Sequence, residues 1–283
     1  ATIYGFGKNE TLIGETLKDR KNDYVQASKC VLMFDGEKRR IDARPESIKA
    51  ACEASLKRLQ RDVIDLYYMH RPDKNVPIED SIGAMADLVK EGKIRMVGLS
   101  EMGAGLLRRA HAVHPVAAMQ SEYSLLTRNP EIAVLDACKE LGVTFVPFSP
   151  VGRGYLADNP PAPKDYHAAD MRRIFPRWTE PYWTENLPLL KQAQDMAGDM
   201  GCTMSQLAIA WTLAKDPDCV PIPGTTSAKH LRDNFAAAQV ALTPDQVAHL
   251  DAVFAPEAVK GPRYNEMAQA SVDTEQYPFE LTA

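Results

Sequence analysis

The chain has 283 residues, of which 45% are hydrophobic and 25% are charged, a balance typical of a globular protein. Its formal net charge of −5 argues against a nucleic-acid-binding surface, which is usually basic. No run of about 18 apolar residues occurs, so the sequence predicts no membrane span.

The five cysteines are widely spaced, and the chain has no CxxC pair and no Cys/His spacing typical of a zinc site. We therefore expect no metal centre. Reduced thiols are the simplest interpretation of such a pattern, and they indicate a cytoplasmic protein.

Short apolar strands alternate with helical stretches along the chain. The stretch "IYGFGKNE" (3–10) predicts a loop that leads directly into a helix. In chain order we then expect a strand at 23–29, a helix at 44–59, a strand at 63–70, a helix at 78–93, a strand at 94–100, a helix at 103–113, a strand at 116–120, a helix at 130–142 and a strand at 143–150. A long loop, helices at 185–200 and 203–215, a strand at 219–224, and helices at 227–238 and 243–254 follow.

This alternation predicts a parallel sheet covered by helices, which both an open doubly wound sheet and a closed barrel would satisfy. Polar residues or glycine stand at the carboxyl end of most strands: Lys29, His70, Ser100, Gln120, Ser149 and Gly224. A (β/α)8 barrel, or TIM barrel, gathers all such ends around one mouth. An open sheet more often has a GxGxxG turn, and none is present. The sequence therefore favours the barrel.

Only about six strands are recognisable, whereas the barrel needs eight. We expect the first one to two strands and the first helix to precede Ala1. The predicted organisation is a single barrel domain over 1–283, incomplete at its N-terminus, with a long active-site loop at 151–185 and an irregular tail at 255–283.

Three side chains in this arrangement could carry chemistry: Tyr4 in the opening loop, Lys29 at one strand end and His70 at the next. A free phenol is a weak acid with a pKa of about 10, and a nearby ammonium favours its phenolate form. A tyrosine beside a lysine can therefore protonate an oxygen, and a histidine can orient the same oxygen. Each residue also has a plainer interpretation, as a packing tyrosine, a paired lysine or a core histidine.

Seven segments, in order, resemble the aldo-keto reductase family of NADPH-dependent (β/α)8 oxidoreductases. They are "YGFGKNE", "ASK", "DLYYMHRPD", "VGLSE", "QSEYSLL", "FSPVGRG" and "IPGTT…LRDN". The GLSE and SPxGRG motifs are most similar to the bacterial and plant branch of that family.

The resemblance implies a role for each matching residue. Tyr4 would be the general acid, Lys29 its partner and His70 the residue that orients the carbonyl. Ser100 and Gln120 would bind the nicotinamide carboxamide, and Tyr123 would stack near the ring. The pyrophosphate would lie along Ser149, Pro150, Gly152 and Arg153. The adenosine end would be surrounded by Gly224, Thr225, Thr226, His230, Asp233 and Asn234.

The chain departs from the family pattern at three places. The family's catalytic aspartate stands about five positions before the tyrosine, outside this chain, so Lys29 would lack its carboxylate partner. Glu101 stands where many relatives have asparagine. Thr226, Lys229 and His230 replace the arginine that usually meets the 2′-phosphate, so NADP(H) is the expected cofactor and NAD(H) is an alternative.

The resemblance implies an enzyme that reduces a small-molecule aldehyde or ketone by direct hydride transfer, with neither nucleic acid nor membrane as a partner. Two alternatives stay open: a catalytically slow, nucleotide-binding regulatory subunit of the same fold, and a Schiff-base aldolase that uses Lys29. The aromatic residues of loop 151–185 either line the substrate pocket or anchor the loop to the barrel. The sequence does not indicate the physiological substrate or the oligomeric state.

Overall fold

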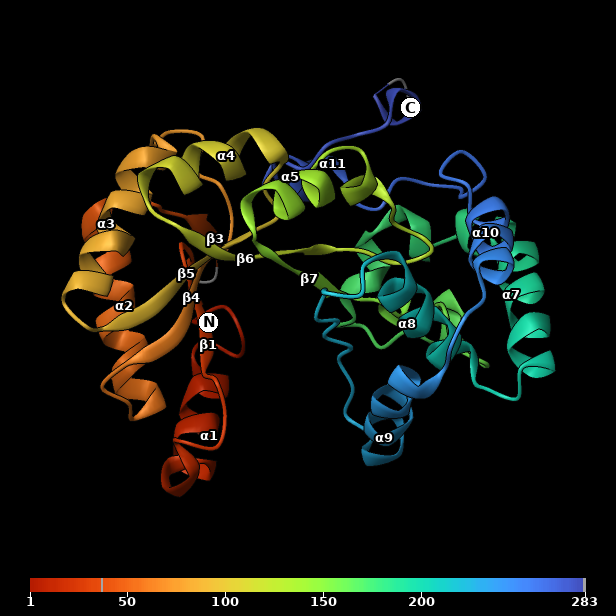
Figure 1. The fold of residues 1–283 in the computed structure, drawn as a ribbon, viewed down its shortest axis with the longest axis horizontal. Helices are drawn as coiled ribbons and strands as arrows, with labels where there is room; N and C mark the ends of the chain where they lie inside the picture. Colours follow the sequence, from red (N-terminus) through yellow and green to blue (C-terminus); the bar gives the residue numbers. More distant parts are fainter. Residues whose placement is uncertain (37, 282–283) are drawn as a thin grey trace. The chain divides into compact units, whose positions relative to one another are not determined.

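The computed structural model describes residues 1–36 and 38–281 (Figure 1). The contacts within the chain divide it into two compact units. The first unit contains Ala1–Gln120, Asp136–Thr144 and Ser271–Thr274; the second contains Ser121–Leu135, Phe145–Ala270 and the C-terminal residues from Glu275 onward.

Parallel strands form the sheet of the first unit, in the order β1-β4-β5-β6. Their bounds are β1 (Ala27–Cys30), β4 (Ile64–Met69), β5 (Ile94–Ser100) and β6 (Val116–Glu122), whose last two residues belong to the second unit. In the register, Lys29 is paired with Tyr68, Met69 with Leu99 and Ser100 with Gln120. Because the strands are parallel and in this register, their carboxyl ends lie along one edge of the sheet.

The helices of the first unit follow the predicted pattern. Their bounds are α1 (Lys8–Thr16), α2 (Pro45–Leu59), α3 (Ile78–Lys90), α4 (Ala104–Val113) and, at the boundary with the second unit, α5 (Val134–Leu141). Figure 1 shows α2, α3 and α4 one after another along the outer side of the strands. Pro45 occupies the first turn of α2, where its missing N–H is not needed.

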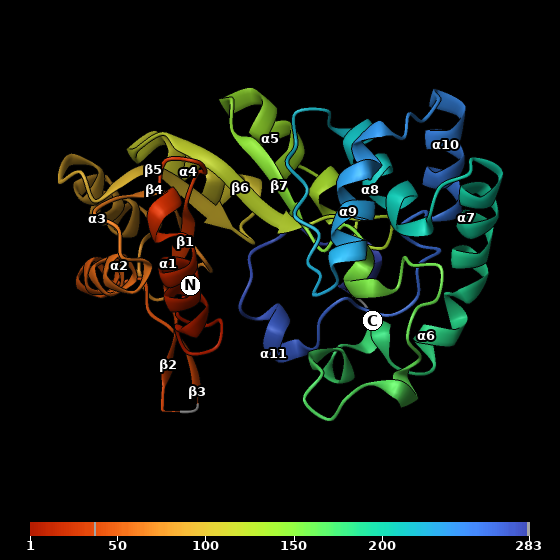
Figure 2. The ribbon, with the colours of Figure 1, turned by 90° about the horizontal axis from the view of Figure 1, so that it is seen from below.

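A hairpin that the sequence analysis did not predict follows β1 directly. It consists of β2 (Leu32–Asp35) and β3 (Lys38–Ile41), paired antiparallel with Leu32 opposite Ile41 and Phe34 opposite Arg39. Figure 2 shows the hairpin extending beyond the end of β1. Its sequence signal was the Asp35-Gly36 pair between apolar and polar runs, a dipeptide that favours tight hairpin turns.

In the second unit, the end of β6 continues beside β7 (Thr144–Phe148), where the Tyr123 N–H donates to the carbonyl oxygen of Phe148 at 3.3 Å. The strand predicted over 219–224 is reduced to a single bridge between Ile222 and Phe148. Pro221 and Pro223 flank Ile222 and have no N–H to donate, so a regular ladder cannot extend through them.

The remaining helices of the second unit are close to their predicted bounds. They are α7 (Leu187–Asp199), α8 (Met204–Lys215), α9 (Ala228–Ala236) and α10 (Pro244–Val253), with short helices α6 (Tyr182–Glu185) and α11 (Glu266–Gln269). Thr203 and Thr243 each begin their helix with a reciprocal capping box. These caps satisfy backbone N–H groups at the first turns of α8 and α10.

Candidate active site

Tyr4 lies in the loop that precedes α1. The three residues after it, Gly5, Phe6 and Gly7, all have left-handed backbone conformations, with φ of 62°, 55° and 87°. This run turns the chain sharply, and α1 begins at Lys8. Tyr4 is 46% exposed and is therefore not part of the core.

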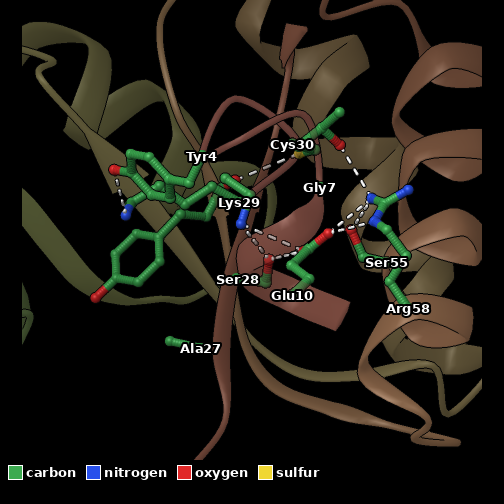
Figure 3. Close-up of polar contacts among 12 residues, drawn as sticks. Tyr4, Gly7, Glu10, Ala27, Ser28, Lys29, Cys30, Ser55 and Arg58 are labelled. Atoms are coloured by element: carbon green, nitrogen blue, oxygen red, sulfur yellow. Dashed lines mark hydrogen bonds and ion pairs between the residues drawn. The ribbon is translucent and has the colours of Figure 1, made fainter. Parts of the chain in front are cut away.

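Lys29 lies in β1, and its side chain reaches the Tyr4 hydroxyl. Its Nζ donates a hydrogen bond to the Tyr4 Oη at 3.4 Å (Figure 3). The same nitrogen lies 5.2 Å from the Tyr4 ring centre and 5.8 Å from that of Tyr68. Within the described part of the chain, no carboxylate forms an ion pair with Lys29. The phenol and these two rings are therefore the ammonium's close polar and aromatic neighbours.

His70 follows β4, the strand next to β1, and its ring centre lies 5.9 Å from that of Tyr4. The side chain is buried, and its Nδ1 has no hydrogen-bond partner among the residues that the structure describes. Burial, followed by the charges of Arg71 and Lys29, lowers the pKa of His70 to about 2. The imidazole is therefore neutral near pH 7 and carries a single N–H donor.

A buried polar cluster links α1, the helix that follows the Tyr4 loop, to β1, the strand that carries Lys29 (Figure 3). Glu10, in the first turn of α1, accepts from the Nε of Arg58 at 2.7 Å and from the hydroxyl of Ser28. Ser28 precedes Lys29 in β1, and Arg58 belongs to α2. Because Glu10 binds both, α1 is fixed against the strand that carries Lys29. Neither Glu10 nor Arg58 was singled out in the sequence.

Ser100 ends β5 and is paired with Gln120 of β6, the next strand of the same sheet, and both residues are buried. The Ser100 hydroxyl accepts a weak hydrogen bond from Arg71 at 3.5 Å, and the Gln120 carbonyl accepts from the Glu101 N–H at 2.9 Å. Glu101 has a left-handed φ of 57°. The structure thus brings Tyr4, Lys29, His70, Ser100 and Gln120 into one unit, the last four of them in or directly after neighbouring strands β1, β4, β5 and β6.

The loop after β7, in the second unit, has an unusual backbone. Ser149, Gly152, Arg153 and Gly154 all have positive φ values, of 52°, 54°, 53° and 89°. Such conformations are strained for residues other than glycine, and they concentrate at ligand sites. Pro150 is buried beside them.

The Arg153 side chain is held by groups of its own unit. Its guanidinium lies 2.7 Å from Glu122, and its centre lies within 6 Å of four aromatic rings, those of Phe148, Phe175, Trp178 and Tyr264, at 5.9, 4.9, 5.3 and 5.6 Å. The position of Arg153 along a pyrophosphate stays a prediction. Glu122 is fully buried and was not recognised in the sequence.

Tyr123 requires a correction. The resemblance implied that its ring stacks near a nicotinamide, but the side chain has no exposed surface. Its hydroxyl donates to Glu131 at 2.7 Å, and its ring packs against Trp211 and Phe145. Burial, and then the Glu131 charge, raise the pKa of Tyr123. Stacking needs an accessible face, so Tyr123 is a core residue.

The N-terminus of α9 is open to solvent. Gly224, Thr225, Thr226 and His230 are exposed, and Asp233 and Asn234 are half-buried on the same helix. Ser227 caps the helix by accepting from the His230 N–H, and Thr225 accepts from the Ser227 N–H at 3.1 Å. Asp233 forms an ion pair with Lys229 at 2.9 Å. An exposed helix N-terminus favours anions such as phosphate.

The aromatic residues of loop 151–185 anchor the loop within the second unit. Tyr155, Tyr166, Phe175 and Trp178 are buried, and the Trp178 indole N–H donates to the Gly152 carbonyl oxygen at 2.9 Å. Of the two interpretations in the sequence analysis, the structure favours anchoring.

All five cysteines are free thiols. Over the described residues, no group of three or more His, Cys, Asp or Glu side chains is arranged to hold a metal ion. The same residues include no helix that is long and apolar enough to cross a membrane.

Comparison with known proteins identifies the family. The model of the Aldo/keto reductase family matches residues 1–255. The chain is 40% identical over 278 residues to the aldo-keto reductase str7 of Strobilurus tenacellus, covering 96% of this chain and 82% of that protein. The chain therefore belongs to the aldo/keto reductase family, which consists of oxidoreductases that act on carbonyl compounds.

Solved structures agree with this assignment. The glycerol dehydrogenase of Gluconobacter oxydans is similar with a TM-score of 0.84 and 26% identity, over 92% of this chain and 81% of that one. An aldo/keto reductase of Klebsiella pneumoniae, solved with NADP and acetate, has a TM-score of 0.71 and 24% identity over 93% and 81% of the two chains. The predicted α/β fold of the (β/α)8 barrel type is confirmed.

Proposed function

We propose that the protein reduces an aldehyde or ketone to an alcohol, with NADPH as the hydride donor. The observation that carries this proposal is the contact between the Lys29 ammonium and the Tyr4 hydroxyl, with the neutral imidazole of His70 beside them. When bound, NADPH supplies a hydride to the carbonyl carbon.

The protein's own side chains supply the proton. Tyr4 donates its hydroxyl proton to the carbonyl oxygen as negative charge develops there, and the Lys29 ammonium stabilises the resulting phenolate. His70 donates one hydrogen bond to the same oxygen. Because its pKa is lowered to about 2, His70 stays neutral and does not compete with Tyr4 as the acid.

The chemistry of the available groups fits a nicotinamide dinucleotide. In the first unit, Ser100 and Gln120 offer the hydroxyl and amide that a carboxamide would require. In the second unit, the strained loop at Ser149–Gly154 and the exposed start of α9 suit phosphate groups. Lys229 and His230 on α9 are the side chains that would meet a 2′-phosphate, with Asp233 already paired to Lys229.

The test is a steady-state assay with the full-length protein, NADPH and a panel of aldehydes and ketones. The absorbance of the reduced nicotinamide measures the rate at which NADPH is consumed. Consumption of NADPH that depends on the carbonyl compound is expected. Binding of NADPH without turnover on any carbonyl would favour the regulatory alternative. Trapping of a carbonyl compound on Lys29 by borohydride would favour the Schiff-base aldolase.

A further inference from the structure

A stacked pair of aromatic rings lies in and beside the Tyr4 loop, with Phe6 exposed and Phe34 half-buried. Phe6 follows Tyr4 by two residues and is 64% exposed. It stacks on Phe34 of the β2–β3 hairpin, with ring centres 4.1 Å apart and an interplanar angle of 22°. The exposed ring of such a pair offers an apolar surface to a ligand.

The backbone at Phe6 adopts a strained conformation. Its φ of 55° is left-handed, which is unusual for a bulky residue. Strain of this kind concentrates at ligand-binding positions. The neighbouring Gly5 and Gly7 also have left-handed backbone conformations, but they have no side chain and so incur no steric penalty. Phe6 is therefore the residue of this turn that carries the strain.

The hairpin register places a cation on the same face as Phe34. Phe34 is directly opposite Arg39, so the two side chains share a face, and Arg39 is exposed. Met33 and Arg40 form the next opposing pair and occupy the other face. On that face Arg40 contacts the Met33 sulfur at 3.6 Å and Asp42 at 3.0 Å.

This face of the hairpin is close to the catalytic residues. Val31 alone separates β2 from β1, the strand that carries Lys29. The positive charge of Arg39 makes the smallest of the contributions that lower the pKa of His70, after burial and the charges of Arg71, Lys29 and the N-terminal amino group. Phe6 follows Tyr4 by two residues and stacks on Phe34, so the two rings lie beside the loop that carries the proposed acid.

We propose that Phe6, Phe34 and Arg39 form a substrate-selecting wall that favours aldehydes with an aromatic ring bearing a carboxylate. The rings would stack on the aromatic part of the substrate, and the guanidinium would pair with its carboxylate. This inference rests on the proposed carbonyl reduction and adds the class of substrate.

The experiment compares kcat/KM of the full-length protein for butanal, benzaldehyde and para-carboxybenzaldehyde. Phe34→Ala should lower the value for both aromatic aldehydes about tenfold, the equivalent of one lost aromatic contact, and leave butanal unchanged. Arg39→Gln should lower the value about threefold for para-carboxybenzaldehyde alone, as expected for an exposed charge pair.

Matched controls come from the opposite face of the same hairpin. Met33→Ala and Arg40→Gln should leave the preference among the three aldehydes unchanged, although Arg40→Gln also removes the ion pair with Asp42. NADPH affinity measured on every variant verifies folding. The proposal would be overturned if Phe34→Ala lowered kcat/KM equally for all three aldehydes. It would also be overturned if the control variants Met33→Ala and Arg40→Gln changed the preference among the aldehydes as much as Phe34→Ala and Arg39→Gln do. If the wild-type protein reduces none of the three or any other carbonyl, the proposed function fails instead.

Discussion

The Nζ of Lys29 lies 3.4 Å from the hydroxyl oxygen of Tyr4, although the two residues are 25 positions apart. Glu10 accounts for this proximity, because it binds Arg58 and Ser28 and so holds the helix after Tyr4 against the strand of Lys29. The positions of the two side chains are therefore fixed by the buried cluster around Glu10, and their proximity does not depend on their own weak hydrogen bond.

Tyr4→Phe should lower kcat for carbonyl reduction by about 10²- to 10⁴-fold, the usual contribution of a general acid. The ring and its packing are retained, so NADPH affinity should not change. Steady-state kinetics and a fluorescence titration with NADPH measure the two quantities. Tyr24→Phe, at a half-buried tyrosine that stacks on Arg61, is the control. A wild-type rate in Tyr4→Phe would remove Tyr4 as the acid.

His70 should make the fold sensitive to acid. In the folded protein burial, followed by the charges of Arg71 and Lys29, lowers the pKa of His70 to about 2 from an ordinary value of 6.5. Between these values the unfolded chain binds a proton that the folded chain does not. The free energy of unfolding should therefore fall by about 1.4 kcal/mol for each pH unit below the ordinary value.

Urea unfolding of the wild-type protein and of His70→Gln, measured between about pH 7 and pH 5, checks this prediction. The variant lacks the titrating group, so its stability should fall less steeply as the pH is lowered. Parallel pH dependences in the two proteins would show that the imidazole is already accessible to protons in the folded state.

Gly7→Ala should destabilise the protein and disturb catalysis together. A Cβ atom at Gly7 would lie 2.9 Å from the Cδ of Arg58, and the φ of 87° is unfavourable for alanine. We expect a loss of about 1–3 kcal/mol in the free energy of unfolding. Gly83→Ala is the matched control, since it lies within α3 with no atom near its Cβ position, and it should stabilise by about 0.5–1 kcal/mol. Thermal unfolding of both variants distinguishes these outcomes.

Sequence patterns were sufficient for the elements whose signals are local. Apolar strands with polar ends gave β4 and β5 almost to the residue, and Pro45 marked the start of α2. The β2–β3 hairpin was missed because each strand has only four residues and β3, Lys38–Ile41, is mostly polar and exposed. The strand expected at 219–224 was overestimated because the apolar pattern outweighed the two prolines.

The candidate site was predictable where a residue type has few plausible alternatives. A lysine and a histidine at neighbouring strand ends pointed to Lys29 and His70, and the structure brings both to Tyr4. Tyr123 was misassigned because it is buried by contacts with Glu131 and Trp211, and both of these residues lie outside the motif QSEYSLL. The ion pair of Glu122 with Arg153 was not predicted either, because it joins residues that are 31 positions apart in the sequence.

His230→Ala should weaken NADPH binding more than NADH binding, because the 2′-phosphate is present only in NADPH. The loss should be modest, about threefold, since His230 is exposed. Fluorescence titrations with the two cofactors provide the comparison, and Arg232→Ala removes a charge from the same helix as the control. Equal losses for NADPH and NADH in His230→Ala would contradict a contact with the 2′-phosphate.

Glu122→Gln should be among the more destabilising single changes in the second unit. Glu122 is fully buried, and it is the anion that Arg153 meets at 2.7 Å and Arg263 at 3.7 Å. Removal of one partner of a buried ion pair leaves the other charge without compensation, at a cost of about 3 kcal/mol or more.

Glu79→Gln, in an exposed pair with Arg109 at 2.8 Å, is the matched control and should change the stability little. The double variant Glu122→Gln/Arg153→Met should be more stable than the sum of the two single changes predicts, because the second change removes the uncompensated charge. Urea unfolding of the wild type, of Glu122→Gln, of Arg153→Met and of the double variant gives the coupling energy. If Glu122→Gln costs no more than Glu79→Gln, the Arg153 guanidinium is free to leave Glu122 and to meet a phosphate directly.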